Sequence, residues 1–442
     1  MRTVSSAERA KSIEVLTQEI ETQEAFVEFV SGVEDPAVQL QVPNLKSMLA
    51  LTKKVRQVVK DDEPFVYSWF VLGPEIYHAM DLFWDSGPRA EFGTFLALSV
   101  PEYLEQVLKD CDRVAVSSDI CTLHRLALSA IEMKRSPKPW AAVACIHPCD
   151  GVSQAQSAVE RAWPDVPMFW MDSPYYPDER GVKFFAGQMR RMAKFLEEHT
   201  GKRLDLDKLR DVCNATNEQY ALWGEFDALK RNRPCPVGSW AGYGIWNMMQ
   251  NNPLTFGQPI TTQYIKSLIT DAEEKVAAGK GHLENEKVRV LFMDIAPVWF
   301  AEFAEMLEQE CNGVVVVEGQ GGSYAYTPID TSTEESMFMG IARRNCMETP
   351  MIRTSRGPVD IIINDMIRNV LDYKIDVVIA PGHMGHKDMQ ASLKIIRDAC
   401  ETVGAKLLNF QYDLFDNRYM PMEEIRRIVT QFIDAMSEEK LI

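Results

Sequence analysis

The stretch Val288-Arg-Val-Leu-Phe-Met-Asp-Ile295 decides the fold, because it is a strand-length apolar run followed by a helix and a second strand. The helix is predicted over Ala301–Cys311 and the second strand over Gly313–Glu318. This order is typical of parallel pairing, since parallel strands need a crossover connection. The alternation continues with strands over Asp376–Ala380 and Ala405–Tyr412, and with helices over Asp360–Leu371 and Asp388–Val403.

The same alternation occurs in the first half of the chain. Strands are predicted over Arg113–Ser117, Trp140–His147 and Val166–Asp172, with helices over Gln154–Ala162 and Gly181–His199. Two separate runs of alternation indicate two parallel-sheet domains. The predicted fold class is therefore α/β, with two Rossmann-like or flavodoxin-like parallel-sheet domains, a helical N-terminal segment and helical insertions.

Helical periodicity outside these runs sets the expected domain boundaries. Apolar residues recur at spacings of three and four near the N-terminus, at Ile13, Leu16 and Ile20. Long helices are predicted over Asp205–Lys230 and Thr262–Ala278. We expect a helical segment over 1–60, a first α/β domain over 61–235, a helical connection over 236–285 and a second α/β domain over 286–442.

Composition narrows the class of protein. The 442 residues carry a formal charge of −17, which opposes binding to nucleic acid or to an anionic membrane. No apolar run reaches the length of a membrane span, and the N-terminus lacks the apolar core of a signal peptide. We therefore expect a cytoplasmic protein. Its nine cysteines, an odd number, favour buried thiols or metal ligands over disulfides.

Two cysteines lie where chemistry is expected. Ligands of open α/β sheets bind beyond the carboxyl ends of the strands. Cys149 follows the predicted strand Trp140–His147, and Cys121 begins a predicted helix. Thiolates near free backbone N–H groups have lowered pKa values and bind soft metals. The alternative for each is a buried structural thiol.

Two histidines, His383 and His386, lie three residues apart in the loop after the predicted strand Asp376–Ala380. They suit metal binding, or proton donation to a substrate oxygen. Loop histidines that are hydrogen-bonded to the backbone are the alternative. The common zinc and dinucleotide signatures CxxC, HExxH and GxGxxG are absent from the sequence.

Several short segments, by their order and spacing, resemble the subunits of 2-hydroxyacyl-CoA dehydratases and ATP-dependent benzoyl-CoA reductases. The resemblance covers nearly the whole chain after about residue 60. The segments are Leu72-Gly-Pro-Glu-Ile-Tyr-His-Ala79, Ser118-Asp-Ile-Cys121-Thr, Cys145-Ile-His-Pro-Cys149-Asp, Met171-Asp-Ser-Pro174-Tyr, Lys280-Gly281, Ala296-Pro-Val-Trp299-Phe, Ile375-Asp-Val-Val-Ile379 and Asp413-Leu-Phe-Asp-Asn-Arg418-Tyr419.

This resemblance implies an oxygen-sensitive enzyme whose [4Fe–4S] cluster is held by three cysteines, with one iron site left for substrate or another small ligand. Cys121 and Cys149 stand where the first two cysteines belong. Ungapped alignment puts His386 in place of the third. His386 is therefore the predicted third ligand, as histidine replaces cysteine in Rieske centres. Two alternatives stay open: Cys346 substitutes for it, or the cluster is lost or altered.

The chemistry that the resemblance implies is single-electron. An ATP-dependent iron–sulfur activator protein delivers an electron, and the cluster passes it to the thioester carbonyl of an acyl-CoA. The resulting ketyl radical expels a leaving group or accepts protons. The net reaction is dehydration of a 2-hydroxyacyl-CoA or reduction of an aromatic acyl-CoA. A homologous second subunit is the expected partner, in a heterodimer or a larger complex.

Two residues are the candidate catalytic groups. Glu75 lies in the first matching segment, and a solvated glutamate at a helix start is the alternative. His383 lies in the histidine loop and suits proton donation to a substrate oxygen.

Four residues are candidates for binding the acyl-CoA. Gly319, Gly321 and Gly322 are predicted to let the backbone approach a phosphate or a thioester, and a plain turn is the alternative. Arg418 is predicted to pair with the CoA phosphates, and an internal ion pair is the alternative.

Two other functions are consistent with the sequence. One is a non-catalytic partner subunit of such a complex, with an incomplete or absent cluster. The other is a cytoplasmic α/β protein that binds zinc through Cys149 and His386.

Overall fold

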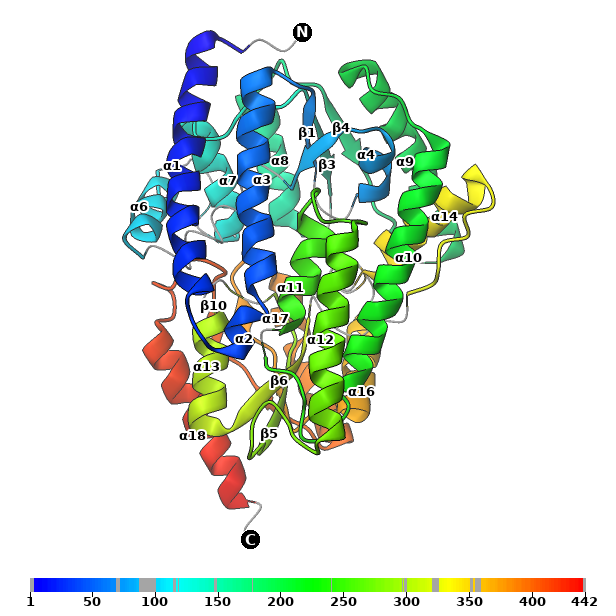
Figure 1. Cartoon of the computed structure of the whole chain (residues 1–442). Helices are drawn as coiled ribbons and strands as arrows, with labels where there is room; N and C mark the ends of the chain where they lie inside the picture. The colour runs from blue at the N-terminus through cyan, green and yellow to red at the C-terminus, as the bar shows by residue number, and fades with distance from the viewer. Residues whose placement is uncertain are drawn as a thin grey trace.

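Two four-stranded parallel sheets organise the chain (Figure 1). The computed structural model describes residues 4–68, 72–86, 101–113, 117, 119–146, 149–176, 178–239, 241–295, 297, 300–319, 326–349, 353 and 359–439. The first sheet lies in the upper half of Figure 1 and the second in the lower half. The predicted α/β class with two parallel sheets is confirmed.

The second sheet contains β5 (Val288–Phe292), β6 (Gly313–Glu318), β7 (Val377–Ile379) and β9 (Lys406–Leu408), in the order β6-β5-β7-β9. Every residue of β5, β6 and β7 is buried, as expected of parallel strands covered on both faces. The last predicted strand divides into β9 and β10 (Gln411–Tyr412). β10 pairs with β8 (Gly382–His383), which holds the histidine loop beside the C-terminal part of the chain.

The first sheet contains β1 (Phe65–Ser68), β2 (Phe83–Asp85), β3 (Ala141–Cys145) and β4 (Met168–Met171), in the order β2-β1-β3-β4. β3 and β4 fall within predicted strands. β1 and β2 have only four and three residues, too few for a clear periodicity, and the sequence did not predict them. Most of the predicted strand Arg113–Ser117 lies outside the described residues.

The two sheets share one topology. In each sheet, the second strand in sequence pairs with one edge of the first strand, and the third strand pairs with its other edge. The switch points therefore lie between β1 and β3 and between β5 and β7. Crevices that bind ligands form beyond the carboxyl ends of strands at such points. Cys149 follows β3, both loop histidines follow the end of β7, and Asp294 follows β5.

Helices cover and connect the sheets (Figure 1). Those before β5 are α1 (Ser6–Ser31), α2 (Pro36–Gln39), α3 (Val42–Asp61), α4 (Pro74–Ala79), α6 (Pro101–Cys111), α7 (Thr122–Glu132), α8 (Asp150–Ala162), α9 (Glu179–Thr200), α10 (Leu206–Leu229), α11 (Ala241–Trp246) and α12 (Pro259–Ala277), with the π-helical turn η1 (Asn247–Asn251). Those after β5 are α13 (Phe300–Cys311), α14 (Glu334–Arg343), α16 (Val359–Tyr373), α17 (Lys387–Val403) and α18 (Met422–Glu439), with the π-helical turn η2 (Arg344–Glu348). Within the described ranges, none of these helices combines the length and apolarity needed to cross a membrane.

The N-terminal segment is helical, as predicted, and forms a pair of packed helices. α1 begins with a capping box, in which Ser5 accepts from the backbone N–H of Glu8 and the Glu8 carboxylate accepts from that of Ser5. Leu16 of α1 and Val55 of α3 belong to one buried cluster with Phe65 of β1. Burial of these apolar side chains holds the helix pair against the first sheet.

One helix from the second half of the sequence packs on the first half. α14 follows β6 in sequence, yet it lies beside α9 and α10 in the upper half of Figure 1. Arg343 of α14 forms an ion pair with Glu179 of α9 at 2.6 Å. The chain before α14 is fixed to α10, because Asn217 both donates to and accepts from the backbone of Ile329.

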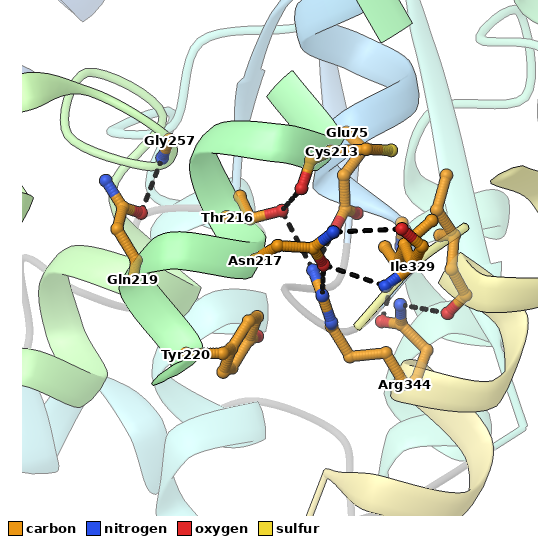
Figure 2. Close-up of polar contacts among 12 residues, drawn as sticks. Glu75, Cys213, Thr216, Asn217, Gln219, Tyr220, Gly257, Ile329 and Arg344 are labelled. Atoms are coloured by element: carbon orange, nitrogen blue, oxygen red, sulfur yellow. Dashed lines mark hydrogen bonds and ion pairs between the residues drawn. The ribbon is translucent and has the colours of Figure 1, made fainter. Parts of the chain in front are cut away.

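A buried ion pair joins the same two parts (Figure 2). Nη1 of Arg344, at the start of η2, lies 3.1 Å from Oε1 of Glu75 on α4, and the two side chains are 2% and 1% exposed. The guanidinium also donates to Thr216 at 2.8 Å and lies 4.2 Å from the ring centroid of Tyr220. Burial raises the pKa of Glu75, and the charge of Arg344 opposes this rise.

We expect Glu75→Gln to lower the free energy of unfolding by about 3 kcal/mol, because the substitution leaves the buried Arg344 without a compensating charge. Urea unfolding followed by tryptophan fluorescence measures the loss. Glu335→Gln is the control, since Glu335 of α14 is exposed and forms an ion pair with Arg190 of α9, where α14 packs on the first half of the chain. It should cost about 0.5 kcal/mol or less. Equal losses for the two variants would contradict the importance of the Glu75–Arg344 pair.

Candidate metal centre

Cys149 occupies a helix N-terminus at the switch point of the first sheet. β3 ends at Cys145, and Cys149 is the N-cap of α8 with extended backbone dihedrals. Of the nine cysteines, Cys149 alone is not fully buried. Free backbone N–H groups and the helix dipole stabilise a thiolate at such a position.

Cys121 holds the equivalent position on the neighbouring helix. It is the N-cap of α7, which packs against α8. His124, in the first turn of α7, places Nε2 at 3.8 Å from Sγ of Cys149. Gly151 permits this approach, because a Cβ there would lie 3.1 Å from Cδ2 of His124.

The second sheet contributes an imidazole to the same place. His386 is the N-cap of α17, and it lies near enough to Cys149 to lower the pKa of that thiol. Its Nδ1 lies 2.8 Å from Oδ1 of Asp294, which follows β5. With Nδ1 bonded to the carboxylate, Nε2 is the nitrogen left for the sulfur. Carboxylates orient metal-ligating histidines in this way.

A second group of donors adjoins the first. The ligand atoms of Cys121, His383 and Asp413 all lie within 4.8 Å of one another. Gly385 allows this packing, because a Cβ there would lie 2.6 Å from the Cβ of Cys121. His383 is 1% exposed, and neither of its ring nitrogens has a hydrogen-bond partner among the described residues. Such buried polar atoms are suited to bind a ligand.

Asp413 ties the C-terminal part of the chain to the helix of Cys121. Its Oδ2 accepts the backbone N–H of Thr122, the first residue of α7, at 3.2 Å. Its Oδ1 accepts the N–H groups of Phe415 and Asp416, both at 3.0 Å. A carboxylate at a helix N-terminus satisfies a free donor and interacts favourably with the helix dipole. Asp413 therefore positions Cys121.

The charges at the centre are coupled. Burial alone would raise the pKa of Cys149, but hydrogen bonds and positive charge from His124 and His386 lower it to about 5. Burial alone would lower the pKa of His386, but Asp294 and Cys149 raise it well above its usual value. His386 in turn lowers the pKa of Asp294 against the effect of burial. The favoured state is a row of thiolate, imidazolium and carboxylate.

The adjoining donors favour their neutral forms. Burial, and then the positive charge of His386, lowers the pKa of His383 to about 4. Burial, followed by the negative charges of Asp413 and Cys149, raises the pKa of Cys121 well above its usual value. A soft cation would reverse the preference of this thiol, since a bound metal favours the thiolate.

The structure places Cys121, Cys149 and His386 at the N-termini of α7, α8 and α17, with α7 packed on α8 and Gly385 packed on Cys121. It adds three residues that the sequence did not assign to the site: His124, Asp294 and Asp413. Position at the carboxyl edge could have indicated Asp294, and Asp413 lies in a matching segment. Nothing in the sequence could have assigned His124 to the site, because a single histidine is common in an amphipathic helix. Cys346, the alternative third ligand, is buried within the hydrophobic core at η2.

The other candidate residues have different surroundings. Glu75 contacts Arg344 at the link described above. Arg418 donates to Asp416 at 2.7 Å and to Asp112 at 2.9 Å, so it takes part in internal ion pairs. Gly319 follows β6 and lines a small cavity. Gly321 and Gly322 lie outside the described residues. The roles assigned to all five stay predictions.

Fold and centre together define a class: a two-sheet α/β protein in which sulfur and imidazole donors meet beyond the carboxyl ends of both sheets. The family model for the 2-hydroxyglutaryl-CoA dehydratase D-component matches residues 71–436. The chain belongs to this family, and the family resemblance predicted from the sequence is confirmed.

Curated relatives are dehydratase subunits. The chain is 24% identical over 238 residues to the (R)-phenyllactyl-CoA dehydratase alpha subunit of Clostridium sporogenes. This alignment covers 51% of the chain and 58% of the relative. The chain is 24% identical over 183 residues to subunit alpha of (R)-2-hydroxyglutaryl-CoA dehydratase from Acidaminococcus fermentans, with coverages of 40% and 37%. It is 23% identical over 193 residues to the (R)-2-hydroxyisocaproyl-CoA dehydratase alpha subunit of Clostridioides difficile, with coverages of 41% and 46%. The alignments thus span about half the length of these relatives.

We expect Asp413→Ala to lower the free energy of unfolding by about 3 kcal/mol, because three backbone N–H groups lose a charged acceptor. Denaturant unfolding of the metal-free chain measures the loss. Asp178→Ala is the matched control, since Asp178 is a half-exposed N-cap that accepts one backbone N–H, from Gly181, besides an exposed contact with Arg180. It should cost about 1 kcal/mol. A smaller loss for Asp413→Ala than for Asp178→Ala would contradict the role given to Asp413.

Proposed function

We propose that the chain is a cluster-bearing subunit of an oxygen-sensitive enzyme that dehydrates a 2-hydroxyacyl-CoA, or reduces an aromatic acyl-CoA, by single-electron chemistry. The observation that carries this proposal is the position of Cys121, Cys149 and His386, each the N-cap of a helix near the switch points of the two sheets, with the His386 loop packed against Cys121 through Gly385. Membership of the dehydratase family supports the acyl-CoA part of the proposal.

The donors present suit an iron–sulfur cluster. Two thiol sulfurs and an imidazole are ligands that such clusters accept. Cys121 and Cys149 are both helix N-caps, where free backbone N–H groups favour a thiolate once a cation is bound. The buried ring nitrogens of His383, which have no partner among the residues that the structure describes, also support binding of a group here. In the proposed arrangement Cys121, Cys149 and His386 hold the cluster.

Each remaining residue has a defined task in this proposal. A bound cluster would supply electron transfer to the thioester carbonyl. Asp294 fixes the ring of His386, and Asp413 fixes the helix of Cys121. His383 is neutral at pH 7 because its pKa is lowered to about 4, so one ring N–H can donate to a substrate oxygen. Burial of these groups keeps water from the reacting atoms.

Partners follow from the same proposal. The relatives are named alpha subunits, which supports a homologous second subunit in a heterodimer or a larger complex. We further propose an ATP-dependent iron–sulfur activator as electron donor and a cytoplasmic location.

A second candidate function rests on one specific arrangement. His386 lies between the carboxylate of Asp294 and the sulfur of Cys149, in the order found in cysteine acyltransferases. In this reading the Cys149 thiolate attacks an acyl-CoA carbonyl and forms a new thioester. The CoA thiolate that leaves takes its proton from His386. Water then cleaves the acyl-enzyme, which releases the acid and restores the thiol.

Metal and acid-labile sulfide analysis of the anaerobically purified chain, with Mössbauer spectra, tests the proposal. We expect iron and sulfide in the wild type. His386→Ala should remove most of the iron, because one of three ligands is lost. His386→Cys should keep the iron and lower the reduction potential, because histidine ligands raise the potential of a cluster relative to thiolates. His383→Ala is the control and should keep the iron.

Other outcomes point elsewhere. Zinc, or no metal, in the wild type would overturn the cluster proposal. Unchanged iron and potential in both His386 variants would overturn the ligand assignment, and loss of iron in His383→Ala would favour the group of Cys121, His383 and Asp413. An acyl adduct on Cys149, detected by mass spectrometry after mixing the metal-free chain with acyl-CoA, would support the second candidate.

A further inference from the structure

Three donors of the centre form a compact group beside the pair Cys149 and His386. The sulfur of Cys121, a ring nitrogen of His383 and a carboxylate oxygen of Asp413 all lie within 4.8 Å of one another. These residues come from the start of α7, from β8 and from the segment directly after β10. Three segments that are distant in the sequence therefore converge on one buried point.

Main-chain contacts position the three donors. β8 pairs with β10 in parallel, and His383 is in register with Tyr412, the residue before Asp413. Asp413 in turn accepts the backbone N–H of Thr122, next to Cys121, at 3.2 Å. Carboxylates that bind metals are commonly held by hydrogen bonds of this kind. The group is therefore fixed by the backbones of α7, β8 and β10.

His383 is buried with its hydrogen-bonding capacity unused. The residue is 1% exposed, and within the described ranges neither ring nitrogen has a partner in hydrogen-bond geometry. Its Nε2 lies near Cys121, since a Cβ on Gly385 would lie 3.1 Å from this nitrogen and 2.6 Å from the Cβ of Cys121. An imidazole buried with both nitrogens unbonded is costly. A cation bound between His383 and Cys121 would remove part of this cost.

The chemistry of the donors selects the kind of cation. Sulfur and imidazole nitrogen are ligands of zinc and similar transition-metal ions, whereas magnesium and calcium take oxygen ligands. A carboxylate oxygen completes a mixed set that zinc accepts. Zinc bonds at about 2.0–2.3 Å, which places tetrahedral ligands roughly 3.5 Å apart. Side-chain rotations suffice to bring donors that lie within 4.8 Å of one another to this separation.

We propose that Cys121, His383 and Asp413 bind a single divalent ion of the zinc type in a chain that carries no cluster. Three protein ligands leave a fourth tetrahedral position for water or for a ligand oxygen, as in catalytic zinc sites. The site uses neither Cys149 nor His386, and it does not rest on the acyl-CoA part of the proposed function. Because Cys121 is assigned to both sites, one chain holds either the cluster or the single ion.

Titration of the full chain with Co²⁺ tests this site, because cobalt replaces zinc and its absorption spectrum reports the ligands. The chain is first freed of bound metal with a chelator under anaerobic, reducing conditions. We expect one Co²⁺ per chain, with a sulfur-to-cobalt charge-transfer band in the near ultraviolet and the strong visible bands of four-coordinate cobalt. Added Zn²⁺ should displace the cobalt and remove these bands, because zinc binds such donors more tightly than cobalt does.

Variants identify the ligands. Cys121→Ser should abolish the charge-transfer band, because the band requires a sulfur ligand. His383→Leu should lower the Co²⁺ affinity by about a hundredfold, since loss of even a hydrogen-bond partner of a ligand costs roughly 10- to 100-fold. This substitution removes no hydrogen bond of the described part of the chain. Cys346→Ser, at a thiol buried in the hydrophobic core, is the control and should keep the band and the affinity. Far-UV circular dichroism verifies that each variant is folded.

Cys149→Ser separates this site from the proposed cluster ligands, and it should keep the charge-transfer band. Survival of the band in Cys121→Ser, its loss in Cys149→Ser, unchanged affinity in His383→Leu, or no binding by the wild type would each overturn the proposal.

Iron and sulfide analysis of the chain before metal removal tests the cluster separately. Iron with sulfide in the untreated chain, but no cobalt site in the stripped chain, refutes only the single-ion site. A cobalt site in a chain purified without iron and sulfide refutes only the cluster.

Discussion

The hydrogen bond between Asp294 and His386 is the interaction on which the centre depends. It joins the ends of β5 and β7, the two strands at the switch point of the second sheet. Because the carboxylate bonds to Nδ1, the ring presents Nε2 to Cys149 of the first sheet. A buried imidazolium would otherwise be unfavourable, and the flanking carboxylate and thiolate offset its desolvation.

Other contacts hold the two halves of the chain in the relative position that this hydrogen bond requires. Donors from two separate sheets meet only if the sheets are fixed relative to one another. The Glu75–Arg344 pair provides such a link in a buried environment, where an ion pair has one well-defined geometry. α14, which leaves the second half to pack on α9, provides another.

The sequence predicted the strands that form long apolar runs, and β6 matches its predicted range of Gly313–Glu318. It missed β1 and β2, whose few residues carry no periodicity and acquire strand geometry only by pairing with β3 and with each other. It did not predict α14, and an amphipathic pattern would in any case show that a helix has a buried face but not which element covers that face. Cys121 and Cys149 followed from position at strand and helix ends, whereas His124 depends on a contact between α7 and α8 that only the folded chain reveals.

A histidine at position 386, where the family resemblance implies a cysteine, has a physical consequence. A thiolate has no second polar atom, whereas imidazole has a second nitrogen that needs a partner when buried. Asp294 is that partner, so the histidine and the aspartate form one unit across the switch point. His383 lies beside this unit, its ring centroid 4.7 Å from that of His386, and neither of its nitrogens has a partner in the described part of the chain. Burial, and then the positive charge of His386, lowers its pKa. The carboxylate of Asp294 therefore favours the charged form of one imidazole, while burial and the charge of that imidazole favour the neutral form of the other.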